Sequence, residues 1–155
     1  MLIGKKHFLT VGAMALAMAI AAPVAAQQKS VAITAIVEHP ALDAVRDGVQ
    51  DALKQAGYEA GKNLKWQYQS AQGNNGTAAQ IARKFVGDKP DAIVAIATPS
   101  AQAVVAATKD VPVVYSAVTD PVAAQLVTSM DASGTNVTGV SDLLALDKQV
   151  DLIKK

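Results

Sequence analysis

Hydrophobic and polar positions divide the chain into short apolar segments that alternate with segments of helical periodicity. The first apolar segment, SVAITAIV, is nearly continuous, as in strands of a parallel sheet covered on both faces. The second, NLKWQYQS, alternates apolar and polar residues, which predicts a strand with one exposed face near a sheet edge. We expect five strands, at residues 30–37, 63–70, 91–97, 111–115 and 136–140.

The segments between these strands have the spacing of amphipathic helices. In residues 41–56, Leu42, Val45 and Val49 recur every three or four positions, and Gly57 supplies a C-terminal stop. After a GNNG loop at 73–76, we expect further helices at residues 77–86, 100–108 and 121–129. Alternating strands and helices predict an α/β fold, a doubly wound parallel sheet in a Rossmann-like three-layer arrangement.

The first 26 residues have the pattern of a secretory signal peptide. Lys5 and Lys6 precede an apolar run at 8–22, and the small residues at 22–26 provide an A-x-A site, so we expect cleavage after Ala26. The alternative is a membrane anchor, but a span needs about 20 apolar residues and this run is shorter. The prediction is an exported, periplasmic protein.

Composition narrows the choice of partners. The chain has 14 basic and 13 acidic residues, and removing the leader, with its two lysines, leaves 12 against 13, a net charge of −1. A basic surface for nucleic acid is therefore not expected. The chain has no cysteine, so there is neither a disulfide framework nor a lipid-accepting cysteine.

The last segment, LDKQVDLIKK at 146–155, begins a helix with no stop signal after it. Either this helix packs on the sheet and completes one domain, or the sequence is part of a longer protein; we expect the second. The expected organisation is a leader at 1–26, an α/β lobe at 27–142 and the start of a crossover at 143–155.

Polar residues follow the expected strands, at the end of a parallel sheet where ligands bind. They are Glu38-His39-Pro40, Ala71-Gln72-Gly73, Thr98-Pro99-Ser100 and Ser116-Ala117-Val118-Thr119-Asp120. Each has a purely structural alternative: Ser100 and Asp120 as helix caps, and His39 as a partner for a nearby carbonyl group. Their convergence on one edge favours a binding site, where hydroxyls and amides hold an anionic group and Asp120 or Glu38 faces a cationic one. An α-amino acid carries both groups.

Catalysis, metals and cofactors have little support. No G-x-S-x-G surrounds Ser100, and His39 is the only histidine after the leader. One histidine with scattered carboxylates lacks metal-ligand spacing, and the first turn, EHPALD, has no glycine for a dinucleotide. We predict a binding protein with no catalytic residues, metal or cofactor.

Four ordered motifs resemble the ABC-transporter substrate-binding protein family that includes tryptophan- and tyrosine-type binding proteins. They are VEHPALDAVRDGVQDALKQAGYEAGKNL, ATPSAQAVV, VYSAVTDPVAAQLV and NVTGVSD, and the resemblance covers residues 30–155. It implies a type I periplasmic-binding-protein fold, in which two α/β lobes close on a small ligand and deliver it to an inner-membrane permease. Members similar to this chain are about twice its mature length, so this chain corresponds to the N-terminal lobe and the second lobe is missing.

The resemblance also implies roles for individual residues. Ser100, with local amides, is expected to take the ligand carboxylate, and Thr119 to be a second hydroxyl donor. Glu38, His39 and Pro40 would form the floor of the site with Gln72 beside it; the other expected contacts are Thr98, Ala101, Ala117, Val118 and Asp120. An aromatic amino acid is the implied ligand, but the ring's stacking partner is expected on the other lobe.

Two rival functions remain open. An exported sensor domain could use the same fold for signalling, and a neighbouring histidine kinase gene in place of a permease gene would favour it. A periplasmic α/β hydrolase acting through His39 and Ser100 is the other alternative, and an activity lost in His39→Ala would favour that reading.

Overall fold

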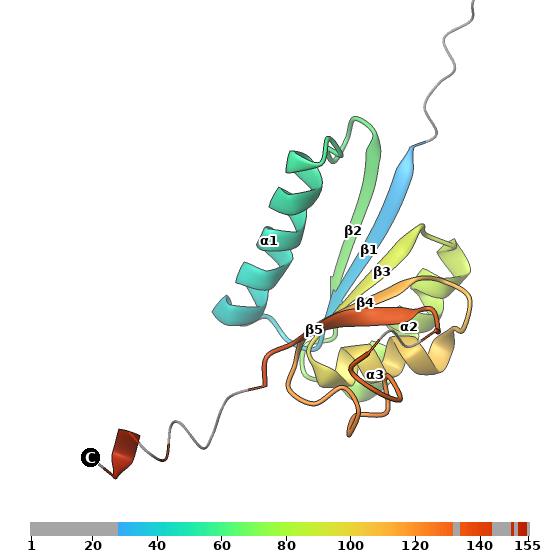
Figure 1. Ribbon diagram of the computed structural model, residues 1–155. Coiled ribbons are helices and arrows are strands. Elements are labelled where there is room, and N and C mark those ends of the chain that lie inside the picture. The colour runs from blue at the N-terminus through green and yellow to red at the C-terminus, as the bar shows by residue number, and fades with distance from the viewer. Residues whose placement is uncertain (1–27, 132–133, 144–149, 151, 155) are drawn as a thin grey trace, which may run out of the picture.

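Five parallel strands form one sheet in the order β2-β1-β3-β4-β5 in the computed structural model (Figure 1). The strands are β1 (Lys29–Ala35), β2 (Leu64–Ser70), β3 (Ala92–Ile96), β4 (Val113–Val118) and β5 (Val137–Ser141). The structure describes residues 28–131, 134–143, 150 and 152–154. The expected α/β fold with a doubly wound parallel sheet is confirmed, and NLKWQYQS is the edge strand β2.

Three helices cover the two faces of this sheet: α1 (Pro40–Gln55), α2 (Asn75–Asp88) and α3 (Thr98–Ala107). Helix α1 lies on one face, whereas α2 and α3 pack together on the other (Figure 1). Each face has its own core: Phe85 and Val104 are fully buried on the α2–α3 side, and Ile33 and Ile96 on the α1 side. This is the three-layer arrangement that the alternating pattern predicts.

The end of α1 follows the expected stop at Gly57. This glycine has a φ of 88°, a backbone conformation that favours glycine. The amides of Gly57 and Tyr58 donate to the carbonyl groups of Lys54 and Leu53, which satisfies two of the helix's last carbonyls.

The segment 121–129, expected to be a helix, is a turn instead. It begins as a helix would, because Asp120 Oδ1 accepts hydrogen bonds from the amides of Val122 and Ala123 at 3.1 and 2.9 Å. It then stops, since Gln125 adopts a φ of 59° and Leu126 turns into the core. One turn is all that the cap and Pro121 support.

Several boundaries also differ from expectation; helix α3, for example, begins at Thr98 and not at residue 100. Helix α2 begins at Asn75, inside the expected GNNG loop, because the Asn74 side chain caps it by accepting from Thr77 N at 2.9 Å. Strand β4 continues to Val118, so Ala117 and Val118 lie at the end of the strand and not in the turn after it. The expected leader at 1–26 and most of the expected helix at 146–155 lie outside the described residues.

Candidate functional site

The carboxyl ends of neighbouring strands lie level with one another. Ala35 pairs with both Ser70 and Ile96, and Ile96 pairs with Ser116. The loops that follow β1, β2, β3 and β4 therefore start from one edge of the sheet. We call this edge the rim: residues 36–39, 71–74, 97–98 and 117–120. The structure thus brings together the loops that the sequence analysis singled out.

The predicted site residues differ in their accessibility. Glu38, His39, Pro40, Gln72, Thr119 and Asp120 are exposed; Thr98 and Ala117 are half-buried; Ser100, Ala101 and Val118 are fully buried. The exposed and half-buried residues form the surface that a ligand can reach in this conformation. The buried three support the rim from behind, and direct contact by the Ser100 hydroxyl stays a prediction that would require a rearrangement.

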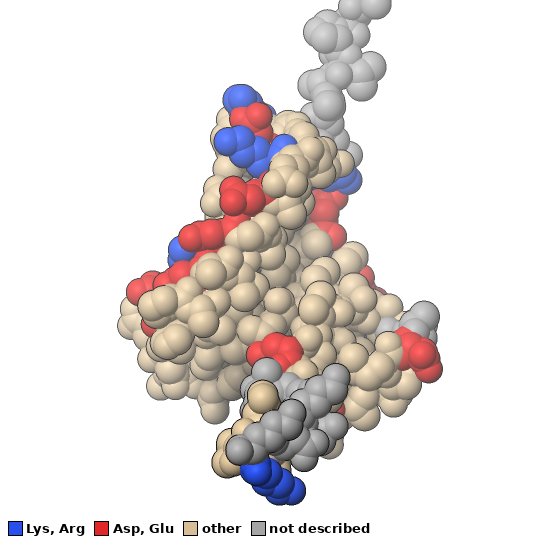
Figure 2. Space-filling view, turned by 60° about the vertical axis from the view of Figure 1, so that its left-hand side comes forward, with Lys and Arg blue, Asp and Glu red and all other residues tan. Residues whose placement is uncertain are grey.

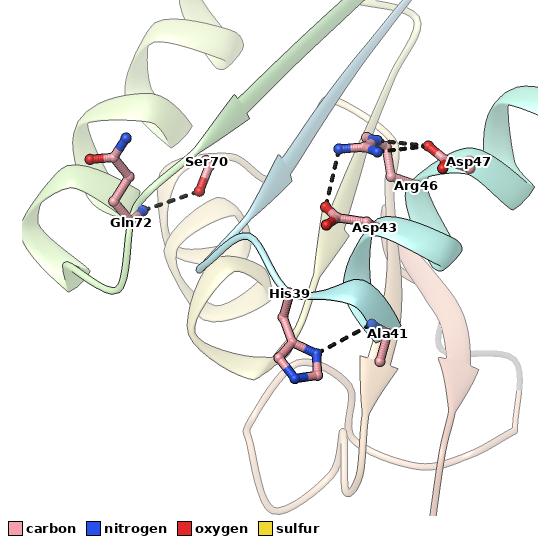
Figure 3. A network of polar contacts seen from close by, with 7 residues as sticks. All are labelled: His39, Ala41, Asp43, Arg46, Asp47, Ser70 and Gln72. Atoms are coloured by element: carbon pink, nitrogen blue, oxygen red, sulfur yellow. Dashed lines mark hydrogen bonds and ion pairs between the residues drawn. The ribbon is translucent and has the colours of Figure 1, made fainter.

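His39 caps the first turn of α1. Its backbone is extended, and its Nδ1 accepts a hydrogen bond from Ala41 N at 3.2 Å (Figure 3). The partner is thus a backbone amide, not the carbonyl group considered from the sequence. An accepting Nδ1 places the proton of the neutral ring on Nε2, which leaves a donor on the exposed side of the imidazole.

Helix α3 starts without a side-chain cap. Ala97 is its N-cap residue, and Ser100 is the third residue of the helix, so the structure contradicts the reading of Ser100 as a cap. Ala97 combines a φ of 72° with a ψ of 154°, a region that residues other than glycine rarely adopt. Its amide donates to Ser116 O at 2.9 Å, so β4 holds the strained residue in place. The first amides of α3 face the rim without a capping side chain, which is the usual setting for an anionic group.

Left-handed backbone recurs around the rim. Gln72 has a φ of 50° after β2, and Ala117 has a φ of 54° near the end of β4, in addition to Ala97 after β3. The Ala117 conformation coincides with a shift in register, because Tyr115 pairs with Gly139 but Val118 pairs with Ser141. One extra residue therefore bulges from β4 at the rim. Strain of this kind concentrates at functional sites, and alanine and glutamine give no sequence signal for it.

The rim contains neither lysine nor arginine. Its segments include Glu38 and Asp120, and Asp120 uses Oδ1 to cap the following turn. Acidic side chains line the α1 side of the molecule, whereas basic ones gather at its upper end (Figure 2). An anionic group at the rim would thus be held by amides and hydroxyls, while the local charge favours a cationic group beside it.

An arginine joins α1 to the edge strand near the rim. Arg46 pairs with Asp43 at 3.1 Å and with Asp47 at 2.8 Å (Figure 3). Its guanidinium lies 4.9 Å from the centre of the Tyr68 ring. The hydrogen bond to Asp47 raises the pKa of the Arg46 guanidinium. Nearby, Gln72 N donates to Ser70 Oγ at 3.2 Å and Gly73 N to Ile36 O at 2.6 Å, which ties the loops after β1 and β2 together.

Several cavities have no rim residue in their lining. One of about 450 Å³ is lined by Val105, Leu126 and Val137 between α3 and β5, and one of about 490 Å³ by Gln69, Thr77 and Gln80 beside α2. A third, of about 410 Å³, is almost wholly apolar and lies between α1 and the sheet. Among the described residues, no cluster of His, Asp or Glu suits a metal ion. No helix in the same part of the chain has both the length and the apolarity to cross a membrane.

Comparison with known proteins decides the family. Residues 30–155 match the sequence profile described as ABC transporter substrate binding protein. The chain belongs to this family. It is 50% identical over 128 residues to the tyrosine-binding protein of Clostridioides difficile strain R20291, covering 83% of this chain and 37% of that protein.

Solved structures agree on the fold. A conserved domain protein from Vibrio cholerae is 57% identical with a TM-score of 0.80, and an ABC domain in complex with L-Trp from Streptococcus pneumonia is 38% identical with a TM-score of 0.78. Each comparison covers 82% of this chain and 43% of the other. This substrate-binding protein therefore has the fold of one lobe of these relatives and spans less than half their length.

Proposed function

We propose that this chain is the N-terminal lobe of a periplasmic binding protein that captures a small, amino-acid-like ligand for an ABC importer. The observation that supports this most is the rim, where the starts of α1 and α3 meet the loops after β2 and β4. Exposed amides, hydroxyls and two carboxylates at one sheet edge can recognise a zwitterion. The family is one of substrate-binding proteins.

An aromatic amino acid is the ligand class that we propose. One relative is named as a tyrosine-binding protein and another was solved in complex with L-Trp. On the rim, the amides at the start of α3 with Thr98 and Thr119 would hold the carboxylate. Glu38 or Asp120 would face the ammonium group, and His39, Pro40 and Gln72 would form the floor.

The remaining parts of the function concern the whole protein. The relatives are more than twice as long as the matched region, which supports a second lobe that closes on the ligand and supplies the stacking partner for its ring. Delivery to an inner-membrane permease and export by a leader at residues 1–26 complete the proposal. Ligand contacts with both lobes would favour the closed form by a shift in population.

A titration of residues 27–155 with L-tyrosine, followed by amide chemical shifts, tests the lobe directly. We expect weak binding, with shifts confined to the amides of residues 38, 39, 41, 72, 98, 100 and 117–120. Tyramine, which lacks the carboxylate, should leave the amides of Thr98 and Ser100 unperturbed. Shifts confined to residues outside the rim, or sub-micromolar affinity for this single lobe, would contradict the proposal.

Substitution of two threonines tests whether hydroxyl groups bind the carboxylate. Thr98→Ala plus Thr119→Ala should weaken tyrosine binding about tenfold, because each removes one hydroxyl donor to the carboxylate. Thr138→Ala on β5 is the matched control, since this threonine is exposed away from the rim. Equal affinity of the double variant and the control would remove the hydroxyls from the site.

A further inference from the structure

The loop after β4 and the chain leaving β5 are joined by one serine hydroxyl. Ser141 Oγ donates to Thr119 O at 2.7 Å, and the same oxygen accepts from Leu143 N at 3.1 Å. A backbone bond from Asp142 N to Val118 O, at 3.2 Å, lies beside it. Thr119 belongs to the rim, whereas Leu143 belongs to the segment that leaves the sheet.

This link lies just beyond the bulge in β4. Between the Tyr115–Gly139 and Val118–Ser141 pairs, β4 uses three steps and β5 only two, so pairing resumes one residue out of step. Strand β4 ends at Val118, and the Thr119 carbonyl, one residue further on, accepts from a side-chain donor. Ser141 thus extends the connection between the two chain segments past the end of the strand pairing.

We propose that Ser141 is a positioning residue that couples the ligand-holding loop after β4 to Asp142 and Leu143. The inference rests on the proposed function, because it assigns a route from the rim to the segment expected to lead out of the lobe. A ligand that orders Thr119 and Asp120 would order Leu143 through the two hydrogen bonds of a single oxygen. The coupling is local and covers only the described residues 117–120 and 141–143.

Amide hydrogen exchange of residues 27–155, measured without ligand, tests the hydrogen bonds of Ser141. In Ser141→Ala, the Leu143 amide should exchange about fivefold faster, in keeping with the loss of one hydrogen bond, and the amides of residues 119 and 120 should follow. Ser141→Thr retains the hydroxyl and should restore the wild-type rate. Thr138→Ala, on the same strand, should leave these amides unchanged. An unchanged Leu143 rate in Ser141→Ala would overturn the proposal.

Added L-tyrosine then tests the coupling itself. In the wild-type chain we expect slower exchange both at residues 117–120 and at Leu143, whereas in Ser141→Ala only the first group should respond. An equal response of Leu143 in both chains would place the coupling elsewhere and overturn the role of Ser141. If tyrosine changes nothing in the wild-type chain, the proposed function fails, and the ligand-free comparison alone decides the link.

Discussion

Gly139 lies against the ring of Tyr115 so closely that a Cβ atom at Gly139 would stand 2.5 Å from both Cγ and Cδ2 of the tyrosine. It would also collide with the Tyr115 carbonyl oxygen. The two residues pair across β4 and β5, immediately before the bulge that shapes the rim. Tyr115 itself is buried, with 3% of its surface exposed.

We expect Gly139→Ala to lower the free energy of unfolding by about 2 kcal/mol or more, because the added methyl group overpacks the strand pair. Urea denaturation followed by circular dichroism measures the change. Gly48→Ala is the matched control: Gly48 lies within α1 with nothing near its missing side chain, so alanine should raise stability by about 0.5–1 kcal/mol. A Gly139→Ala protein as stable as the wild type would show that Tyr115 can shift.

The fold could be predicted from two kinds of hydrophobic pattern in the sequence. SVAITAIV and DAIVAIA are apolar enough to mark buried parallel strands, and the Leu42–Val45–Val49 spacing marks α1. The segment 121–129 shows where this reasoning fails. An acidic cap before proline predicts that a helix begins here. The sequence does not indicate that Gln125 adopts a positive φ, which ends the helix after one turn.

The location of the candidate site could be predicted from the sequence, but its backbone geometry could not. Strand ends gather by topology, which is why the loops after β1, β2, β3 and β4 were found together. The strained Ala97 and the bulge at Ala117 carry no signal, because alanine is an ordinary residue in strands and helices. Ser141 was missed for another reason: its partner, Thr119, is 22 positions away and is reached only through the register of β4 and β5.

His39, which caps α1 beside the rim, gives a prediction about stability. His39→Ala should lower the free energy of unfolding by about 1 kcal/mol, since the Ala41 amide loses its acceptor at the helix start. His39→Asn should retain the stability because asparagine is a good N-cap residue. Thermal unfolding of the three proteins at neutral pH measures both effects. If the asparagine variant is as unstable as the alanine variant, the imidazole stabilises the rim by packing and not by capping.

The far end of the sheet gives a pH-dependent prediction. Asp91 accepts hydrogen bonds from Lys29 Nζ and from the Ser30 amide, both at 2.8 Å. The bond from Lys29, followed by that from Ser30, lowers the pKa of the Asp91 carboxyl. A carboxyl with a lower pKa in the folded than in the unfolded chain stabilises the fold above its unfolded pKa, and this contribution is lost as pH falls through the folded pKa.

Asp91→Asn should therefore lower stability at pH 7, but by less than about 1 kcal/mol, because 42% of the Asp91 side chain is exposed and water screens its charge. The difference from wild type should shrink as the pH falls below about 4. Urea denaturation at several pH values measures it. Asp110→Asn removes an exposed carboxylate from another part of the surface and should have little effect at pH 7. A difference between Asp91→Asn and wild type that stays constant down to strong acid would assign the loss to packing.

The buried hydroxyl of Ser100 gives the sharpest test of the site. This oxygen has no hydrogen-bond partner among the described residues, and Ser100 is fully buried. An unpaired buried hydroxyl destabilises the fold, so Ser100→Ala should leave the free energy of unfolding unchanged or raise it by up to about 1 kcal/mol. Ser30→Ala is the control, since it removes a hydroxyl that bonds with Asp91 and should lower stability. If Ser100→Ala leaves stability intact yet weakens tyrosine binding, the hydroxyl is kept for the ligand and α3 must open to present it. A loss of stability as large as that of Ser30→Ala would instead show that the hydroxyl has a structural partner.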